Sequence, residues 1–346
     1  MPLGVIWGCR MKVLVTGGAG YIGSHTVLEL IEAGHQPVVL DNLINGHAEA
    51  LVRIGRLTQS TIPLIEADVR DGAAVRKALR DHECEAVIHF AGLKAVGDSI
   101  SEPLAYFDCN VGGTLSLLQA MQAEGVKRFI FSSSATVYGT PQFLPYTEDH
   151  PLSAMNPYGG SKLMVENILR DFHVSAPDSG IAILRYFNPV GAHLSGEIGE
   201  DPKGVPNNLM PYVAQVAAGR RDKLRVWGND YPTTDGTGER DYIHVSDLAK
   251  GHIAALKLTA EPGVDTVNLG TGRAYSVLEV ITAFEKASGV TVPYEICERR
   301  AGDLPAFYAD IKLAFEKMGW RAEKGLDDMC ADHWRWQHAN PGGYDD

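Results

Sequence analysis

The first half of the chain alternates short apolar runs with longer stretches in which hydrophobic residues recur at helical spacing. Apolar runs rich in β-branched residues predict buried strands, and the longer periodic stretches predict helices. The predicted strands cover residues 12–16, 37–40, 86–90, 129–132 and 182–186, and the predicted helices cover residues 24–32, 114–124 and 161–174. Because this alternation builds βαβ units, we expect an α/β fold in which a Rossmann-like, doubly wound parallel sheet carries helices on both faces.

The pattern changes after about residue 190, where Gly, Pro and Asn become frequent and the apolar runs become shorter. This change predicts a smaller C-terminal α+β lobe made of short elements and long loops. We therefore expect an N-terminal extension at 1–10, a Rossmann domain at 11–190 and a lobe at 191–346, some of whose segments return to the Rossmann sheet. The tail at 341–346 is expected to be loose.

Composition and charge narrow the classes of function. The chain has 346 residues, of which 45% are hydrophobic and 21% charged, as in an ordinary globular protein. A formal net charge of −12 argues against a nucleic-acid-binding surface. A phosphate-bearing substrate would therefore need local Arg residues or helix N-termini. No run approaches the ~18 apolar residues of a membrane span, and the N-terminus lacks the basic region of a signal peptide.

The cysteines indicate a reducing compartment. They are scattered, without a C-x-x-C pair, at Cys9, Cys84, Cys109, Cys297 and Cys330. Such a set fits free thiols better than a disulfide framework, so a cytoplasmic protein is expected. His and Cys show no metal-ligand spacing either, and no metal is expected.

A glycine-rich segment follows the first predicted strand. Residues 16–25 read TGGAGYIGSH and place Gly17, Gly20 and Gly23 between that strand and the first predicted helix. One glycine permits the tight turn, another lets the backbone approach a pyrophosphate, and the last lets the helix pack close to the sheet. A glycine triplet alone is a weak signal, but this position between strand and helix predicts a dinucleotide site.

Asp41 ends the second predicted strand, 21 residues after Gly20. An acidic residue there accepts hydrogen bonds from the adenosine ribose and would repel a 2′-phosphate, which favours NAD over NADP. The alternative interpretation is a strand-end turn that Asp41 makes before Asn42.

Two further segments are placed to meet the same dinucleotide. Asp68 and Val69 follow an apolar segment at 62–67 and could contact the adenine edge. Phe90-Ala91-Gly92 ends another predicted strand at the carboxyl edge of the sheet, where dinucleotides bind.

Tyr158 and Lys162 form a Y-x-x-x-K motif on a predicted helix, and Ser134 ends the strand before it. The i, i+4 spacing places the Tyr and Lys side chains on one face. A free Tyr is a poor base at neutral pH, but a nearby ammonium stabilises the phenolate and lowers its pKa. Ser134 could hydrogen-bond a substrate hydroxyl and relay its proton. The motif alone is common by chance on helices, and its weight comes from the accompanying glycine turn, Asp41 and Ser134.

This combination resembles the extended short-chain dehydrogenase/reductase family, and within it the 4-epimerases that act on UDP-hexoses. The resemblance runs from about Met11 to Asp346. The stretches that carry it are VLVTGGAGYIGSH, VVLDNL, HFAGLKAVGDS, FSSSATVYG, PYGGSKLMVE, LRYFNPVGAH, PNNLMPYVAQVA, GTGERDYIHVSDLA and AGDLPAFYAD.

The resemblance implies a set of site residues and a lobe at 191–346 that mainly binds the UDP-sugar. The catalytic residues would be Tyr158, Lys162 and Ser134. The NAD site would comprise Gly17, Gly20, Tyr21, Ile22, Gly23, Asp41, Asn42, Asp68, Val69, Phe90, Ala91, Gly92, Lys94, Ser134, Tyr158, Lys162 and Phe187. The substrate site would comprise Ser134, Tyr158, Asn188, Asn208, Leu209, Arg225, Val226, Trp227, Arg240, Tyr242, Arg300, Asp303 and Phe307.

Within that set, Arg240 and Arg300 would clamp the diphosphate and Asp303 would bind the uridine ribose. Arg suits this role because its planar fork matches phosphate oxygens, although each Arg alone could equally be a solvated surface charge. A homodimer is also implied by the resemblance.

Three positions depart from the family pattern. Cys109 stands where an Asn is expected near the cofactor, which puts that contact in question. Gly160 stands where Lys is frequent, and little effect is expected. Phe307 stands where bacterial relatives often have Tyr beside the sugar; alternatively, it is core packing behind Pro305.

The reaction implied is reversible inversion of C4 in UDP-glucose and UDP-galactose through a transient 4-keto sugar, with NAD retained throughout the cycle. The alternatives are a nucleotide-sugar dehydratase or decarboxylase, a non-catalytic dinucleotide sensor, and an alcohol dehydrogenase with exchangeable NAD. Dehydratases and decarboxylases of this family carry acidic residues just after the serine strand, whereas residues 135–137 read ATV here. The intact Ser134, Tyr158 and Lys162 argue against a degenerate sensor.

Overall fold

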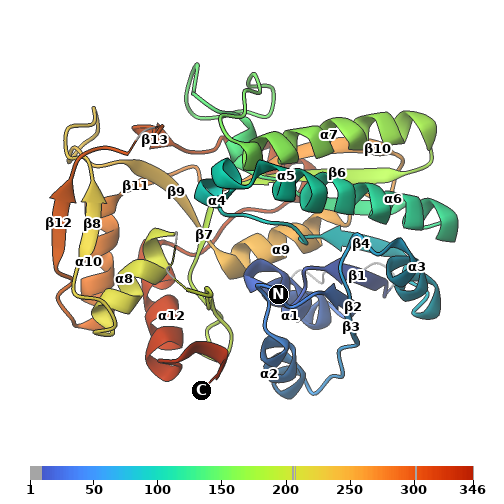
Figure 1. Ribbon diagram of the computed structural model, residues 1–346, viewed down its shortest axis with the longest axis horizontal. Coiled ribbons are helices and arrows are strands. Elements are labelled where there is room, and N and C mark those ends of the chain that lie inside the picture. The colour runs from blue at the N-terminus through green and yellow to red at the C-terminus, as the bar shows by residue number, and fades with distance from the viewer. Residues whose placement is uncertain (1–9, 205, 207, 301, 346) are drawn as a thin grey trace, which may run out of the picture.

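A seven-stranded parallel sheet, with the helices that cover it, forms the larger part of the molecule (Figure 1). The computed structural model describes residues 10–204, 206, 208–300 and 302–345, so nearly all of the extension expected at 1–10 lies outside the described residues. The strand order is β10-β6-β5-β4-β1-β2-β3. The strands are β1 (Lys12–Thr16), β2 (Gln36–Asp41), β3 (Leu64–Glu66), β4 (Ala86–His89), β5 (Arg128–Ser132), β6 (Gly180–Tyr186) and β10 (Gly263–Leu269). The strand order reverses between β1 and β4, and such a reversal is where dinucleotides bind in open α/β sheets.

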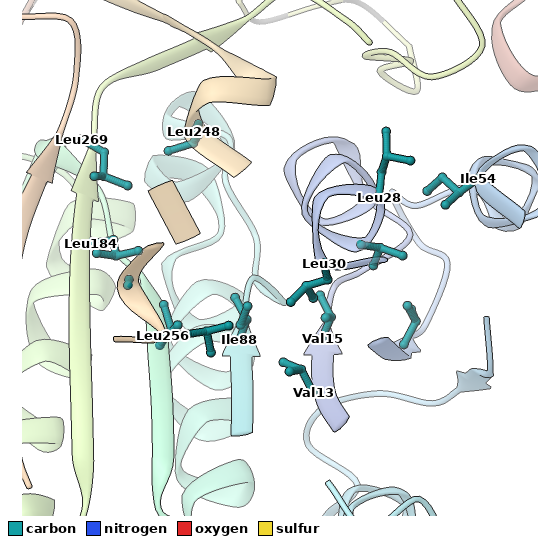
Figure 2. Close-up of a cluster of buried hydrophobic side chains, with 14 of the residues drawn as sticks. Val13, Val15, Leu28, Leu30, Ile54, Ile88, Leu184, Leu248, Leu256 and Leu269 are labelled. Atoms are coloured by element: carbon teal, nitrogen blue, oxygen red, sulfur yellow. The ribbon is translucent and has the colours of Figure 1, made fainter. Parts of the chain in front are cut away.

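Helices cover both faces of this sheet. One face carries α1 (Tyr21–Glu32), α2 (Ala48–Thr58), α9 (Val245–Ala255) and α11 (Lys312–Met318), and the other carries α3 (Gly72–Asp81), α6 (Gly113–Glu124) and α7 (Pro157–Ser175). Figure 2 shows how Val13 and Val15 of β1 meet Leu30 of α1 on the first face. Leu14, between those two valines, belongs to the core on the other face. Strands buried on both faces explain why the sequence shows continuous apolar runs here.

The smaller lobe is built on its own core and a second set of strands. A parallel pair, β8 (Leu224–Trp227) and β12 (Tyr294–Cys297), packs with α8 (Leu209–Ala217), α10 (Val277–Ser288) and α12 (Leu326–Ala339) at the left of Figure 1. Four short strands, β7 (Asn188–Val190), β9 (Glu239–His244), β11 (Ala274–Ser276) and β13 (Ala306–Phe307), form the link to the sheet. Because β10 and α9 come from this half of the chain yet pack in the Rossmann unit, the lobe is not contiguous in sequence.

The predicted strands and helices are confirmed, with shifts at their ends. The helix expected at 161–174 begins at Pro157, because the Asn156 side chain caps it by accepting a hydrogen bond from the Gly159 N–H at 2.9 Å. Proline at the first helical position adds to the same start signal. Tyr158 and Lys162 therefore lie in the first turns of α7.

The expectation of a loose C-terminal tail is wrong for residues 343–345, which form a 3₁₀ turn. Tyr344 is buried against Trp336, with ring centres 4.7 Å apart, and its N–H donates to Asp201 Oδ2 at 2.9 Å. An aromatic anchor thus outweighs the local Gly and Pro content. Among the described residues, no helix is long and apolar enough to cross a membrane.

Candidate active site

The three glycines of the first turn differ in what surrounds them. Gly17 has φ +70°, and its N–H donates to Leu40 O at 2.8 Å. A Cβ on Gly23 would lie 2.1 Å from Gly17 O, so only glycine lets α1 approach β1 so closely. A Cβ on Gly20 would meet only Gly17 O, at 3.3 Å, so that position is open on its other sides. The turn is therefore shaped so that a pyrophosphate can approach the N-terminus of α1 beside Gly20.

Tyr21 and Ile22 begin α1, whose N-cap, Gly20, makes no side-chain capping bond. Their backbone N–H groups belong to the helix end that favours anions. The Tyr21 hydroxyl donates to Gly191 O at 2.7 Å. This bond ties the glycine turn to the beginning of the second half of the chain.

Asp41 lies at the carboxyl end of β2, beside the glycine turn. Its Oδ2 accepts from the Ala19 N–H at 3.0 Å, and its Oδ1 accepts from the Leu43 N–H at 2.8 Å. Burial raises the pKa of Asp41, while these two bonds lower it. The carboxyl group is thus held in one orientation, and each oxygen keeps acceptor capacity for a ribose hydroxyl.

Asn42 and Asp68 extend this edge of the sheet. The Asn42 side chain donates to Asp68 Oδ2 at 3.0 Å. The Arg70 guanidinium donates to both Asp68 oxygens, at 2.8 and 2.7 Å, and holds the pKa of that carboxyl well below its usual value. Val69 is buried under Gly113, where a Cβ would lie 2.6 Å from its Cγ1. These residues together border the place expected for adenine.

Phe90, Ala91 and Gly92 leave β4 against the glycine turn. The Phe90 and Ala91 N–H groups both donate to Thr16 O, at 2.9 and 3.1 Å. A Cβ on Gly17 would lie 2.7 Å from Ala91 N. The two strand ends therefore meet at the carboxyl edge, as the sequence predicts.

Asn110 holds the loop that follows β4, and the sequence analysis did not single it out. It is buried in the π-helical turn Phe107–Gly112, where its Oδ1 accepts from the Leu93 N–H at 2.8 Å and its Nδ2 donates to Ser161 Oγ at 2.9 Å. A Cβ on Gly92 would come within 2.9 Å of Asn110 Oδ1. Cys109, the departure noted above, is only half-buried beside it. The asparagine that supports this loop is thus Asn110, one residue after position 109, where the family pattern has an asparagine.

Ser134, Tyr158 and Lys162 come together where β5 ends against α7. Each is between 6% and 7% exposed. Lys162 Nζ donates to Ser132 O at 2.9 Å and lies 5.9 Å from the centre of the Tyr158 ring. Ser134 Oγ accepts from the Thr136 N–H at 3.2 Å, and the Ser134 side chain is near enough to Tyr158 to lower the pKa of its hydroxyl. The three predicted residues therefore form one buried polar group.

The pKa expectation for Tyr158 is corrected by its surroundings. Burial raises the pKa of Tyr158 above its ordinary value, and the nearby Tyr186 raises it further, while the neighbouring Ser134 side chain lowers it. Burial also lowers the pKa of Lys162 to about 8. The ammonium is still the main form at neutral pH, but in the free chain it is directed at Ser132 O, and desolvation outweighs the lowering predicted for the tyrosine.

A buried ion pair that the sequence analysis missed lies beside these three residues. Arg185 Nη2 lies 2.6 Å from Glu166 Oε2, and Ser133 Oγ donates to Glu166 Oε1 at 2.7 Å. Glu166 follows Lys162 by one helical turn, and Arg185 lies on β6. The pair fixes α7 against β5 and β6. The sequence did contain one signal for this ion pair: Arg185 is the single charged residue in the apolar strand β6.

A cluster of charged residues forms in the lobe. Asp303 accepts from Arg300 Nε at 2.8 Å and lies 4.0 Å from Arg240 Nη2. The Arg300 guanidinium stands over the Trp227 ring, 5.8 Å from its centre. The residues predicted to clamp the diphosphate and bind the uridine are therefore neighbours, although Trp227 and Arg300 lie 73 positions apart in the chain.

β9 runs from this cluster toward the end of β6, where it pairs with β7. Asn188, two residues beyond β6, pairs with the buried Tyr242 of β9, and Phe307 of β13 pairs with Arg240 on the same strand. The Phe307 ring lies 5.1 Å from that of Phe187. β9 thus places Arg240 and Tyr242 of the lobe close to the end of the Rossmann sheet.

Two predicted substrate residues have contacts that limit their roles. Arg225 has a largely exposed side chain, 3.5 Å from Glu295 Oε1, and no described contact joins it to the cluster of Arg240, Arg300 and Asp303. The side chain of Val226 is buried in the lobe's core, so only its backbone can face a ligand.

Glu200 joins predicted residues of both halves and was missed by the sequence analysis. Its side chain is only 3% exposed, and its Oε1 lies 3.3 Å from both Lys94 Nζ and Asn208 Nδ2. Asn208 occupies the N-cap position of α8, whose first residue is Leu209, without a side-chain capping bond. The carboxylate therefore brings Lys94, after β4, next to the α8 N-terminus. The local sequence contains no signal that distinguishes Glu200 from the Gly and Asp on either side of it.

The fold and this site define a dinucleotide-binding enzyme in which Tyr158, Lys162 and Ser134 lie together and a second half carries the cluster of Arg240, Arg300 and Asp303. Residues 13–270 match the model of the NAD dependent epimerase/dehydratase family, and the chain belongs to that family.

The relatives narrow the class further. The chain is 58% identical to a UDP-glucose 4-epimerase of Bacillus subtilis, over 96% of this chain and 99% of that protein. It is 56% identical to the Homo sapiens UDP-glucose 4-epimerase, over 96% and 98% of the two chains. Among solved structures, the Bifidobacterium longum UDP-glucose 4-epimerase in complex with NAD+ and UDP superposes with a TM-score of 0.93 at 53% identity, covering 96% of this chain and 99% of that one.

Proposed function

We propose that this chain interconverts UDP-glucose and UDP-galactose by reversible inversion at C4, with NAD held throughout the cycle. The observation that carries the proposal is the assembly of Ser134, Tyr158 and Lys162 at the carboxyl edge of the sheet, linked through β9 to the cluster of Arg240, Arg300 and Asp303. Proteins of this activity at 54–58% identity over nearly the whole chain support it.

The described residues fit NAD. The cradle at Gly17 and Gly23 has no room for a Cβ, while Gly20 leaves an open side for phosphates. Asp41 presents a fixed carboxyl for the adenosine ribose and would repel a 2′-phosphate. NAD supplies the acceptor and donor of the hydride exchanged with the hexose C4.

Tyr158 is proposed to remove the proton from the hexose O4 as the base. Ser134 lies near Tyr158, whose pKa it lowers, and is proposed to receive or pass on the same proton. Because burial opposes ionisation of Tyr158, the phenolate must gain stabilisation when the site fills, from Lys162 and from the positive charge of the oxidised cofactor. Lys162, whose pKa is lowered to about 8, remains an ammonium at neutral pH for that purpose.

Inversion requires that the 4-keto sugar turn over while the nucleotide stays bound. Arg240 and Arg300 are proposed to hold the diphosphate, with Asp303 on the ribose and Trp227 beside the uracil. Their contacts with one another keep this half of the site in place. The sugar itself would then be free to present either face to the same Tyr158.

The direct test is to incubate the purified protein with UDP-galactose without adding NAD. We expect UDP-glucose to form, and acid denaturation of the same preparation to release NAD. Activity only with added NAD would indicate an exchangeable cofactor and a dehydrogenase, and a 4-keto-6-deoxy product would indicate a dehydratase. An absence of turnover in a preparation that contains NAD would contradict the proposal.

Phe307 is proposed to limit the room beside the sugar, so the plain hexoses should be preferred over their N-acetyl forms. Its ring packs between those of Phe187 and Tyr146, at 5.1 and 4.9 Å, and forms one aromatic wall with them. Forcing an acetamido group into a tight site costs about 1–3 kcal/mol, or roughly 5- to 150-fold in kcat/KM. Phe307→Cys should narrow the preference for UDP-galactose over UDP-N-acetylgalactosamine. Equal use of both sugars by the wild type would refute a size limit at this site. An unchanged preference in the variant would show that a residue other than Phe307 sets the limit.

We also propose a homodimer formed through α6, α7 and the adjoining short helices α4 (Val96–Ser101) and α5 (Pro103–Tyr106). Ile100 and Leu104 are 67% and 81% exposed, and Leu115 and Met164 also face outward. A shallow groove of about 320 Å³ runs between α6 and α7. Sedimentation should give about twice the 37.5 kDa chain mass, and Leu104→Glu should shift it toward one chain. A monomeric wild type at micromolar concentration would contradict the dimer.

A cytoplasmic location is proposed on the basis of the cysteines. Cys84, Cys109, Cys297 and Cys330 are all free thiols, of which Cys84 and Cys330 are buried. Cell fractionation would test this, and recovery of the native protein from an oxidising compartment would contradict it.

A further inference from the structure

Tyr231 has a buried hydroxyl that no described residue hydrogen-bonds. The side chain is only 5% exposed, and Tyr231 Oη is among the few buried polar atoms without a partner. A buried hydroxyl costs free energy unless it is hydrogen-bonded, so an unpaired one in a well-packed protein calls for an explanation. Neither the motifs in the sequence nor the proposed function assigns Tyr231 a role.

Three of the four charged groups that act on this hydroxyl, Arg240, Arg300 and Asp303, belong to the proposed nucleotide site. Burial and the Asp303 carboxylate raise the pKa of Tyr231, while Arg299, Arg240 and Arg300 lower it. Both guanidinium groups of the proposed diphosphate clamp and the proposed ribose ligand are therefore within electrostatic reach of Tyr231. Since the phenol stays protonated at neutral pH, its hydroxyl has a proton to donate.

The ring is held in place from two sides. The Arg299 guanidinium stands 4.1 Å from the centre of the Tyr231 ring and is itself bound to Asp230 Oδ1 at 2.7 Å. On another side, Gly228 makes room for the ring, because a Cβ there would lie 2.6 Å from Tyr231 Cε2.

The backbone around Tyr231 is also closed on itself. The Tyr231 N–H donates to Gly236 O at 2.9 Å, and the Thr233 N–H donates to Tyr231 O at 2.8 Å. The loop that these bonds close leads into β9, which carries Arg240. The hydroxyl is thus fixed in position before any ligand arrives, which lowers the entropic cost of a hydrogen bond to that ligand.

We propose that Tyr231 is a further substrate-binding residue, whose hydroxyl donates a hydrogen bond to the ribose–diphosphate segment of the UDP-sugar among Arg240, Arg300 and Asp303. The inference rests on the proposed function for the identity of the ligand. Phosphate and ribose oxygens are suitable acceptors, whereas the guanidinium groups of Arg240, Arg299 and Arg300 can only donate. The hydroxyl that is unsatisfied in the free chain would gain its partner when the substrate binds.

Tyr231→Phe separates this role from a structural one, because it removes only the hydroxyl. The variant should bind UDP roughly 10- to 100-fold more weakly by calorimetry, the usual effect of losing a hydrogen bond to a charged group. KM for UDP-galactose should rise by a similar factor, with a smaller change in kcat. Without nucleotide, the unfolding midpoint should stay equal or rise by about 1–3 °C, because the change removes an unpaired buried group.

Tyr212→Phe provides the matched control. Arg221 stands over the Tyr212 ring at 4.8 Å, but neither residue belongs to the proposed nucleotide site. The affinity of the Tyr212→Phe variant for UDP should equal that of the wild type. Unchanged UDP affinity in Tyr231→Phe would overturn the proposal, as would weaker binding accompanied by a lower unfolding midpoint in UDP-free protein. The proposed function fails separately, if the wild type does not convert UDP-galactose.

Discussion

Tyr158→Phe should lower kcat for UDP-galactose by about 10²- to 10⁴-fold while leaving the affinity for UDP nearly unchanged. The substitution removes the hydroxyl of the proposed base, beside Ser134. The groups proposed to hold the nucleotide, Arg240 and Arg300, lie in the other half of the site and keep their contacts with Asp303. Steady-state kinetics with a parallel titration of UDP would measure both quantities.

A second buried tyrosine supplies the control for that experiment. Tyr344→Phe also removes a buried hydroxyl, one that donates to Gly199 O at 3.2 Å, but it lies outside the proposed site. It should lower the unfolding midpoint and leave kcat unchanged. If Tyr158→Phe turned over at a near-normal rate, the O4 proton would have to go to another group. If it lost UDP affinity as strongly as kcat, the two halves of the site would not be separable.

Gly23→Ala should destabilise the fold by about 1–3 kcal/mol or more and abolish retention of NAD. The new Cβ would lie 2.1 Å from Gly17 O and 2.8 Å from Gly18 Cα. Both are backbone atoms of the nucleotide turn, so relief requires α1 to move away from β1. Thermal unfolding and the NAD released by acid denaturation would report the two effects.

Two other glycines separate steric strain from loss of the cofactor. A Cβ on Gly160, in α7, would meet no heavy atom within 4 Å, so Gly160→Ala should be neutral or stabilise by about 0.5–1 kcal/mol. A Cβ on Gly20 would meet only Gly17 O at 3.3 Å, so Gly20→Ala should fold but retain less NAD. A Gly23→Ala protein with normal stability and full NAD content would show that the close approach is not required.

Much of the fold and part of the site could be read from the sequence because the signals are local. The apolar runs predicted five strands of the sheet, since strands buried on both faces need continuous hydrophobic residues. The spacing of Gly17, Gly20 and Gly23 reflects the sterics of one turn, and the i, i+4 spacing of Tyr158 and Lys162 reflects one helical turn.

Other features depend on residues far apart in the chain, so only the tertiary structure could decide them. The sequence predicted that some later segment returns to the sheet, but which strand does so, β10 beside β6, follows from packing rather than from any local pattern. Glu200 contacts Lys94, 106 positions earlier, and the unpaired hydroxyl of Tyr231 acquires meaning only beside Asp303.

The pKa of Tyr158, the proposed base, likewise depends on the tertiary structure. The sequence by itself determined that a lysine lies one helical turn from Tyr158, and from this alone a lowered pKa was expected. The tertiary structure buries Tyr158 and directs Lys162 Nζ toward Ser132 O, so the pKa of Tyr158 is raised in the free chain. Spacing along a helix determines which side chains can be neighbours, but the desolvation of a charge depends on every segment that packs around it.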